Sequence, residues 1–165
     1  MNGWPATRAA SARLATPTGS ATLATRPARS EWLWEQAFPG TADQVRHVRA
    51  AARSLLDGCG AQETVVHLLS ELSANAVLHS RSGWPGGEFI VRLRHVPGDC
   101  VWGEVEDAGS GEWGGDLAAS ARDRSGLFIV MALASACGVA ARPKGHRAVW
   151  FCISCQPAHE GDEVR

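Results

Sequence analysis

The segment from about Gln62 to Ser80 is the longest stretch of helical periodicity in the chain, and it constrains the fold more than any other feature. Its apolar residues follow a helical spacing: Val65, Val66, Leu68, Leu69, Leu72, Ala76 and Leu78. A helix with so broad an apolar side is stable only when another layer covers that side. The sequence therefore predicts a long helix that packs against a second layer.

That second layer is predicted by runs in which apolar and polar residues alternate. The runs 89–94 and 101–106 are joined by Pro97-Gly98-Asp99, which is a strong hairpin signal. Further strands are expected at 31–38, 139–142 and 147–154, and further helices at 41–56, with Thr41 as the N-cap, and at 125–137. The order of these elements indicates an α+β fold, a two-layer α/β sandwich whose mixed, mostly antiparallel sheet carries helices on one face.

The 165 residues are enough for one domain with a core. Residues 1–30 are rich in Ala, Ser, Thr, Pro and Arg without an acidic residue, so we expect a disordered arm; the alternative is an organellar transit peptide. The domain is expected at 31–155, and 156–165 should form a polar tail. No apolar run approaches the length of a membrane span, which indicates a soluble, cytoplasmic protein.

Charge and cysteine content exclude several classes of function. The chain has 16 Lys and Arg against 17 Asp and Glu, so no broad positive electrostatic field attracts nucleic acid or an anionic membrane. Cys152 and Cys155 form one C-x-x-C pair without a second pair to complete a zinc site. Two strand thiols are the favoured interpretation, and a metal or redox pair is the alternative.

Residues 109–114 match G-x-G-x-x-G, the spacing of a dinucleotide phosphate loop. Glu106 and Asp107 would repel a pyrophosphate there, and no carboxylate follows about 20 residues later for a ribose. The alternative makes Asp107 the important residue. A carboxylate held at a strand end by a tight turn at Gly109 and Gly111 can accept a hydrogen bond from an exocyclic amine such as that of adenine.

Glu71 and Asn75 lie four residues apart on the long helix, so their side chains share one face. Polar groups beside a buried stripe are costly unless they have partners. An asparagine oxygen is a suitable Mg²⁺ ligand beside substrate phosphates, and a glutamate one turn away can act as a general base. The alternative is an exposed polar strip.

Two later segments complete the pattern. Ser125-Gly126 opens an apolar helix whose free N–H groups can hold a phosphate, and Arg124 adds positive charge. Gly145 to Trp150 turns into the last strand.

In this order the segments resemble the GHKL ATP-binding superfamily of gyrase, the ninety-kilodalton heat-shock chaperone, sensor histidine kinases and mismatch-repair ATPases. The chain looks most like the bacterial anti-sigma-factor serine/threonine kinases. The resemblance runs from about Trp32 to Ile153: residues 71–79 resemble the N box, 106–111 the first glycine box, 124–130 the second and 145–150 the final strand motif.

The resemblance implies a Bergerat-type fold that binds ATP and Mg²⁺. Its catalytic residue would be Glu71 and its metal ligand Asn75, while Asp107 would read adenine. The glycines 109, 111 and 126 would let the backbone approach ATP closely, beside Arg124 and Ser125. Arg124 departs from the glycine usual in the family, so the resemblance does not carry over to the phosphate lid at this position.

Two functions follow as hypotheses. The first is a protein serine/threonine kinase that transfers the ATP γ-phosphate to a serine of an anti-anti-sigma (STAS-type) protein and binds a sigma factor, with homodimerisation open. The second is a nucleotide-gated protein-interaction module with little or no kinase activity. A sensor histidine kinase is disfavoured because no histidine lies in a long coiled-coil pattern. Direct nucleic-acid binding lacks interleaved aromatic residues.

Overall fold

The computed structural model describes residues 31–96, 100–109 and 126–154. The expected arm at 1–30, the tail at 156–165 and Cys155 lie outside the described residues. The elements of the described chain follow in this order: β1 (Trp32–Pro39), α1 (Gln44–Leu55), α2 (Gln62–His79), the 3₁₀ turn η1 (Arg81–Gly83), β2 (Glu88–Val96), β3 (Cys100–Asp107), α4 (Gly126–Leu133), β4 (Ala136–Ala141), the 3₁₀ turn η2 (Pro143–Gly145) and β5 (Arg147–Ser154).

The strands form one five-stranded sheet in the order β1-β2-β3-β5-β4. Every neighbouring pair in this sheet is antiparallel. The hairpin expected from the alternating runs is β2 and β3, in which Val91 pairs with Val105. β3 then pairs with β5, so the last strand lies inside the sheet, between β3 and β4. This pairing brings the end of β3 to the start of β5.

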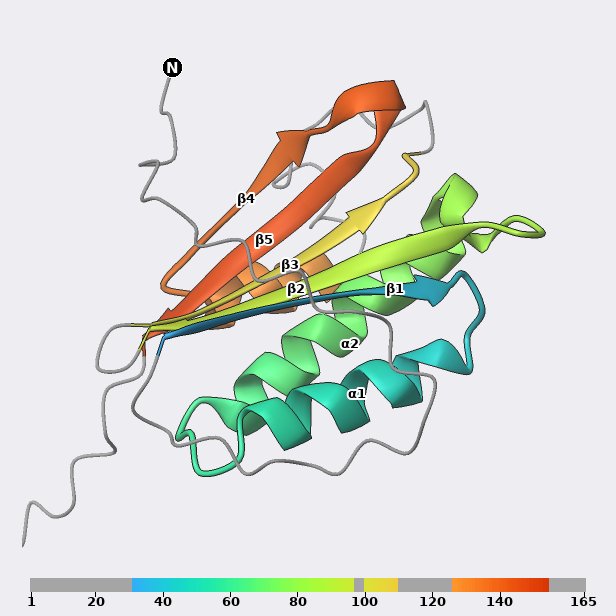
Figure 1. Cartoon of the computed structure of the whole chain (residues 1–165). Coiled ribbons are helices and arrows are strands. Elements are labelled where there is room, and N and C mark those ends of the chain that lie inside the picture. The colour runs from blue at the N-terminus through green and yellow to red at the C-terminus, as the bar shows by residue number, and fades with distance from the viewer. Residues whose placement is uncertain (1–30, 97–99, 110–125, 155–165) are drawn as a thin grey trace, which may run out of the picture.

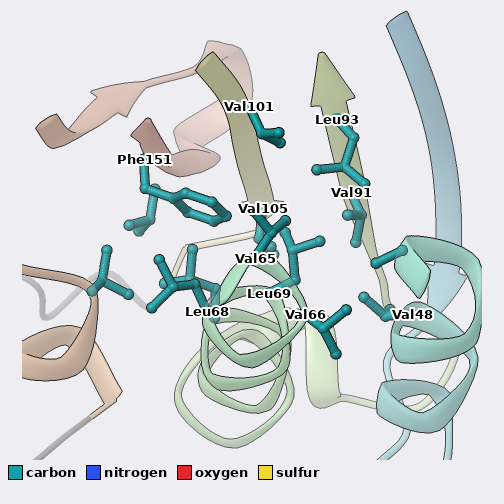
Figure 2. Close-up of a cluster of buried hydrophobic side chains, with 14 of the residues drawn as sticks. Val48, Val65, Val66, Leu68, Leu69, Val91, Leu93, Val101, Val105 and Phe151 are labelled. Atoms are coloured by element: carbon teal, nitrogen blue, oxygen red, sulfur yellow. The ribbon is translucent and has the colours of Figure 1, made fainter. Parts of the chain in front are cut away.

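The helices cover one face of the sheet, which makes a two-layer α+β sandwich (Figure 1). α2 packs on β3 and contacts both α1 and α4. Figure 2 shows its apolar side chains against those of the sheet. The buried side chains of this core include Val65, Val66, Leu68, Leu69, Val91, Leu93, Val101, Val105 and Phe151. The fold class expected from the sequence is confirmed.

Two local expectations were wrong. Asp43 rather than Thr41 is the N-cap position of α1, and it makes no capping hydrogen bond with its side chain. Thr41 instead lies in the preceding turn, where its hydroxyl donates to the Asp43 carboxylate. The apolar run 125–137 is helical only to Leu133 in the described residues, because β4 begins at Ala136 and pairs with β5.

No helix in the described part of the chain is both long and apolar enough to cross a membrane.

Candidate functional site

The long helix α2 carries the first two candidate residues, Glu71 and Asn75, on one face. Both are partly buried, and the neighbouring Leu72 and Ala76 lie in the core and fix the helix to the sheet. The Nδ2 atom of Asn75 is buried and has no hydrogen-bond partner among the described residues. A buried amide of this kind costs free energy unless something else pairs with it. This nitrogen is a donor and could pair with a phosphate oxygen, whereas a metal ion would bind the amide oxygen of the same side chain.

Glu71 also contacts the start of α4. A β-carbon built on Gly126 would lie 2.4 Å from Oε2 of Glu71 and 2.6 Å from its Cβ. Only a glycine fits at this contact, since real β-carbons do not approach other atoms so closely. The N-terminal N–H groups of a helix attract anions. The fold therefore places the carboxylate of Glu71 beside the end of a helix that suits a phosphate.

Asp107 ends β3, and its side chain is only 5% exposed. Its Oδ1 accepts a hydrogen bond of 2.7 Å from the N–H of Gly109. Gly109 has a φ of 66°, in the left-handed region that favours glycine. A β-carbon on Gly109 would lie 2.3 Å from the carbonyl oxygen of Gly145. The loop after β3 is thus packed against the turn before β5.

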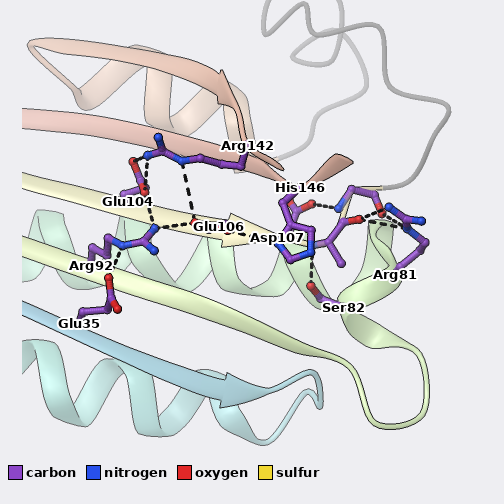
Figure 3. Close-up of polar contacts among 11 residues, drawn as sticks. Glu35, Arg81, Ser82, Arg92, Glu104, Glu106, Asp107, Arg142 and His146 are labelled. Carbon is purple, nitrogen blue, oxygen red and sulfur yellow. Dashed lines mark hydrogen bonds and ion pairs between the residues drawn. The ribbon is translucent and has the colours of Figure 1, made fainter. Parts of the chain in front are cut away.

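The turn η1, which follows α2, fixes this loop from the other side (Figure 3). Arg81 donates from Nη2 and Nε to the carbonyl oxygen of Ala108, at 2.6 and 3.0 Å, and from its backbone N–H to the carbonyl of Gly109. Ser82 accepts a hydrogen bond of 3.0 Å from the N–H of Ala108. The helix of Glu71 and Asn75 is therefore joined directly to the loop of Asp107.

Sequence reasoning missed Arg81, Ser82 and Arg147. Arg147 donates from Nε to Oδ2 of Asp107 at 3.0 Å, its Nη2 lies 2.9 Å from the same oxygen in an ion pair, and its side chain is 14% exposed. The only sequence signal for Ser82 was a hydroxyl just after the helix end, where such side chains commonly bond to backbone. Nothing local pointed to Arg147, because its partner comes from the pairing of β3 with β5.

A second polar cluster lies on the opposite face of the sheet. Successive strand residues point to opposite faces, and Val105 faces α2, so Glu104 and Glu106 face away from the helices. Figure 3 shows Arg92 between these two carboxylates. Its Nη1 lies 2.6 Å from Oε1 of Glu104 and 2.8 Å from Oε2 of Glu106. Arg142 also pairs with Glu104, whose side chain is 1% exposed.

Glu106 is the member of this cluster whose pKa changes clearly. Burial raises the pKa of its carboxyl, but hydrogen bonds from Arg92 and with His146 outweigh that effect and lower it below its usual value. The His146 ring lies 3.2 Å from Oε1 of Glu106. The cluster lies on the face of the sheet opposite the helices, so the sheet itself separates its charges from the candidate site.

The structure places Glu71 against Gly126 and Asp107 against Gly109, and it joins the end of α2 to the loop after Asp107. Gly111, Arg124 and Ser125 lie outside the described residues, so their placement at the site stays a prediction. No group of three or more His, Cys, Asp or Glu side chains in the described ranges could hold a metal ion. A single asparagine still fits Mg²⁺, which takes few protein ligands beside substrate phosphates. Cys152 lies in β5, and its side chain is partly buried.

Comparison with known proteins supports the fold. No protein-family model and no curated protein matches the chain. Among solved structures, it is similar to "The crystal structure of the RsbU and RsbW domains of Rv1364c from Mycobacterium tuberculosis", with a TM-score of 0.55 and 22% sequence identity. The match covers 75% of this chain and 33% of that one, so the chain spans about a third of the length of its relative. This likeness shows that the two structures share a fold.

Proposed function

We propose that the protein is an ATP-dependent, anti-sigma-factor-type serine/threonine kinase. The observation that carries the proposal is the contact of Glu71 with Gly126, which joins the middle of α2 to the start of α4. The Asp107 loop is fixed to the end of the same helix through Arg81 and Ser82. Three segments far apart in the sequence thus surround one region beside α2. The likeness to a structure that contains an RsbW domain agrees with this proposal.

Each residue has a defined role in the proposed reaction. Asp107 accepts a hydrogen bond from the adenine amine, and the N-terminal N–H groups of α4 hold phosphate oxygens. Glu71 takes the proton of the acceptor serine while the serine oxygen bonds to the γ-phosphorus. The bond to the β–γ bridging oxygen breaks, and ADP leaves. Asn75 would hold Mg²⁺, which when bound neutralises phosphate charge.

The acceptor is proposed to be a serine of an anti-anti-sigma (STAS-type) protein, and a sigma factor the regulated partner. These partners come from the resemblance and the similar fold. The proposed consequence is control of transcription: phosphorylation of the acceptor changes which partner the protein holds.

The test measures nucleotide binding and phosphoryl transfer separately. Purified protein is incubated with γ-labelled Mg-ATP and a partner co-purified from the native cell, and serine labelling is followed. Glu71→Gln should bind ATP but lose labelling. The control is Glu63→Gln, which alters an exposed glutamate on the same helix and should label as wild type does.

Absence of nucleotide binding in the wild-type protein would refute the proposal. A partner that binds in a nucleotide-dependent manner without ever being labelled would instead identify the protein as a nucleotide-gated interaction module.

A further inference from the structure

The ion pair between Asp107 and Arg147 lies at the part of the proposed nucleotide site that would bind adenine. Asp107 and Arg147 are register partners on β3 and β5, as are Val105 and Val149. Register partners of neighbouring strands share a face, and Val105 lies on the face that packs against α2. The guanidinium therefore lies on the helix-covered side of the sheet, beside the carboxylate that is proposed to read the base.

This pair is almost completely buried, with side-chain exposures of 5% for Asp107 and 14% for Arg147. Removing two charges from water costs about as much as their attraction returns, so a buried ion pair is weak evidence for stability. Apolar residues in place of both partners would often serve stability as well. The guanidinium at this position calls for a functional explanation.

Hydrogen bonding shows what the guanidinium does to the carboxylate. An ionised carboxylate accepts about four hydrogen bonds, two at each oxygen. The N–H of Gly109 takes one position at Oδ1, at 2.7 Å. Arg147 covers Oδ2: its Nε donates a hydrogen bond of 3.0 Å to this oxygen, and its Nη2 lies 2.9 Å from the same oxygen in the ion pair. Among the described residues, the oxygen that the guanidinium leaves uncovered is Oδ1.

A carboxylate with one oxygen covered suits adenine and disfavours guanine. Adenine presents a single exocyclic amine, which needs one acceptor. Guanine presents two adjacent donors, N1–H and the N2 amine, which a carboxylate with both oxygens free accepts as a bidentate pair. With Oδ2 occupied, guanine would leave a buried donor unpaired, and sites discriminate strongly against ligands that leave buried polar groups unpaired.

We propose that Arg147 is a specificity-determining residue: by occupying Oδ2 of Asp107 it makes the site accept adenine and reject guanine. The inference rests on the proposed nucleotide site. It assigns the choice of base to two residues, Asp107 as the acceptor and Arg147 as the group that limits how many hydrogen bonds the acceptor can receive.

The test is a comparison of Mg-ATP and Mg-GTP affinity by titration calorimetry on the full chain. Arg147→Met keeps a long side chain and removes every donor, so it should free Oδ2 and improve GTP affinity relative to ATP by about tenfold. Arg147→Gln keeps one donor and should give a smaller shift in the same direction. The control is Arg142→Met, an arginine that pairs with Glu104 on the other face, and its ATP to GTP ratio should match wild type.

A ratio that stays at the wild-type value, or moves toward ATP, in an Arg147 variant that still binds ATP would overturn this inference and leave the proposed function standing. Failure of the wild-type protein to bind any nucleotide would overturn both. Thermal unfolding of each variant verifies that it is folded, and if Arg147→Met does not fold, the direction of the shift in Arg147→Gln decides the question.

Discussion

Glu71 and Gly126 are in contact so close that a β-carbon on Gly126 would lie 2.4 Å from the Glu71 carboxylate. This contact joins α2 to α4 where the proposed general base, Glu71, lies beside the helix N-terminus that is proposed to bind phosphate. Any side chain at position 126 must displace Glu71 or move the two helices apart. The contact therefore couples the packing of α2 on α4 to the position of the Glu71 carboxylate, the proposed general base.

Substitution of Gly126 by alanine should lower both stability and phosphoryl transfer. Overpacking of this kind costs about 1–3 kcal/mol in the free energy of unfolding. Urea unfolding measures that change, and labelling with γ-labelled ATP measures transfer. Gly60→Ala is the matched control, because a β-carbon there meets nothing within 4 Å and its stability should change by less than about 0.5 kcal/mol. Equal stability of the two variants would contradict the contact.

Substitution of Asn75 by alanine should separate stability from metal-assisted binding. The change removes a buried amide nitrogen that lacks a partner among the described residues, so the nucleotide-free protein should be as stable as wild type or slightly more so. Its ATP affinity should no longer increase when Mg²⁺ replaces EDTA. Ser73→Ala removes another buried, unpartnered group from the same helix and should keep the Mg²⁺ effect. An intact Mg²⁺ effect in Asn75→Ala would exclude this residue as the ligand.

Substitution of Arg81 by alanine should weaken ATP binding. The change removes the side-chain hydrogen bonds to the carbonyls of Ala108 and Gly109 that hold the loop after Asp107 in place. Loss of about 1 kcal/mol of loop ordering corresponds to about fivefold weaker binding in a calorimetric titration. Arg53→Ala is the control, since that arginine pairs with Glu63 in solvent. If both variants lose affinity alike, the loop contacts are not responsible.

Substitution of Glu104 by glutamine should destabilise the fold far more than the same change at Glu31. Glu104 is 1% exposed and lies within ion-pair distance of Arg92 and Arg142, so loss of its charge removes the most buried carboxylate of the cluster from two guanidiniums. Breaking such a buried pair costs about 3 kcal/mol or more. Glu31 pairs with Arg94 at the surface, where the cost is below about 1 kcal/mol. Chemical denaturation of both variants gives the comparison, and similar losses would mean that burial of Glu104 is unimportant.

Stability should depend on acid pH through Glu106. Its folded-state pKa lies below the ordinary value of 4.5, so the folded state binds the proton less tightly than the unfolded chain does. The resulting stabilisation is fully present above pH 4.5 and is lost as the pH falls below that value through the folded-state pKa. The free energy of unfolding should therefore fall less steeply with acid in Glu106→Gln than in wild type. Identical slopes over this range would show that Glu106 is not the group responsible.

Much of the fold followed from local patterns. The alternation of residues 89–94 and 101–106 specified a hairpin, and the helical spacing of 62–80 specified α2, because these signals involve neighbours in sequence. The end of α4 at Leu133 could not be predicted from a local pattern. A short apolar run suits a buried helix and a buried strand equally, and pairing with β5 decided the matter after Ala136.

The sequence by itself determined that Glu71 and Asn75 share a face, since four residues make about one helical turn, and that Asp107 ends a strand before a glycine turn. Only the tertiary structure decided what these side chains meet. Glu71 meets Gly126 because α4 packs on α2, and Asp107 meets Arg147 because β5 pairs with β3 in one register. Both contacts join segments far apart in the chain, and they depend on how whole elements bury their apolar faces together, which no local pattern encodes.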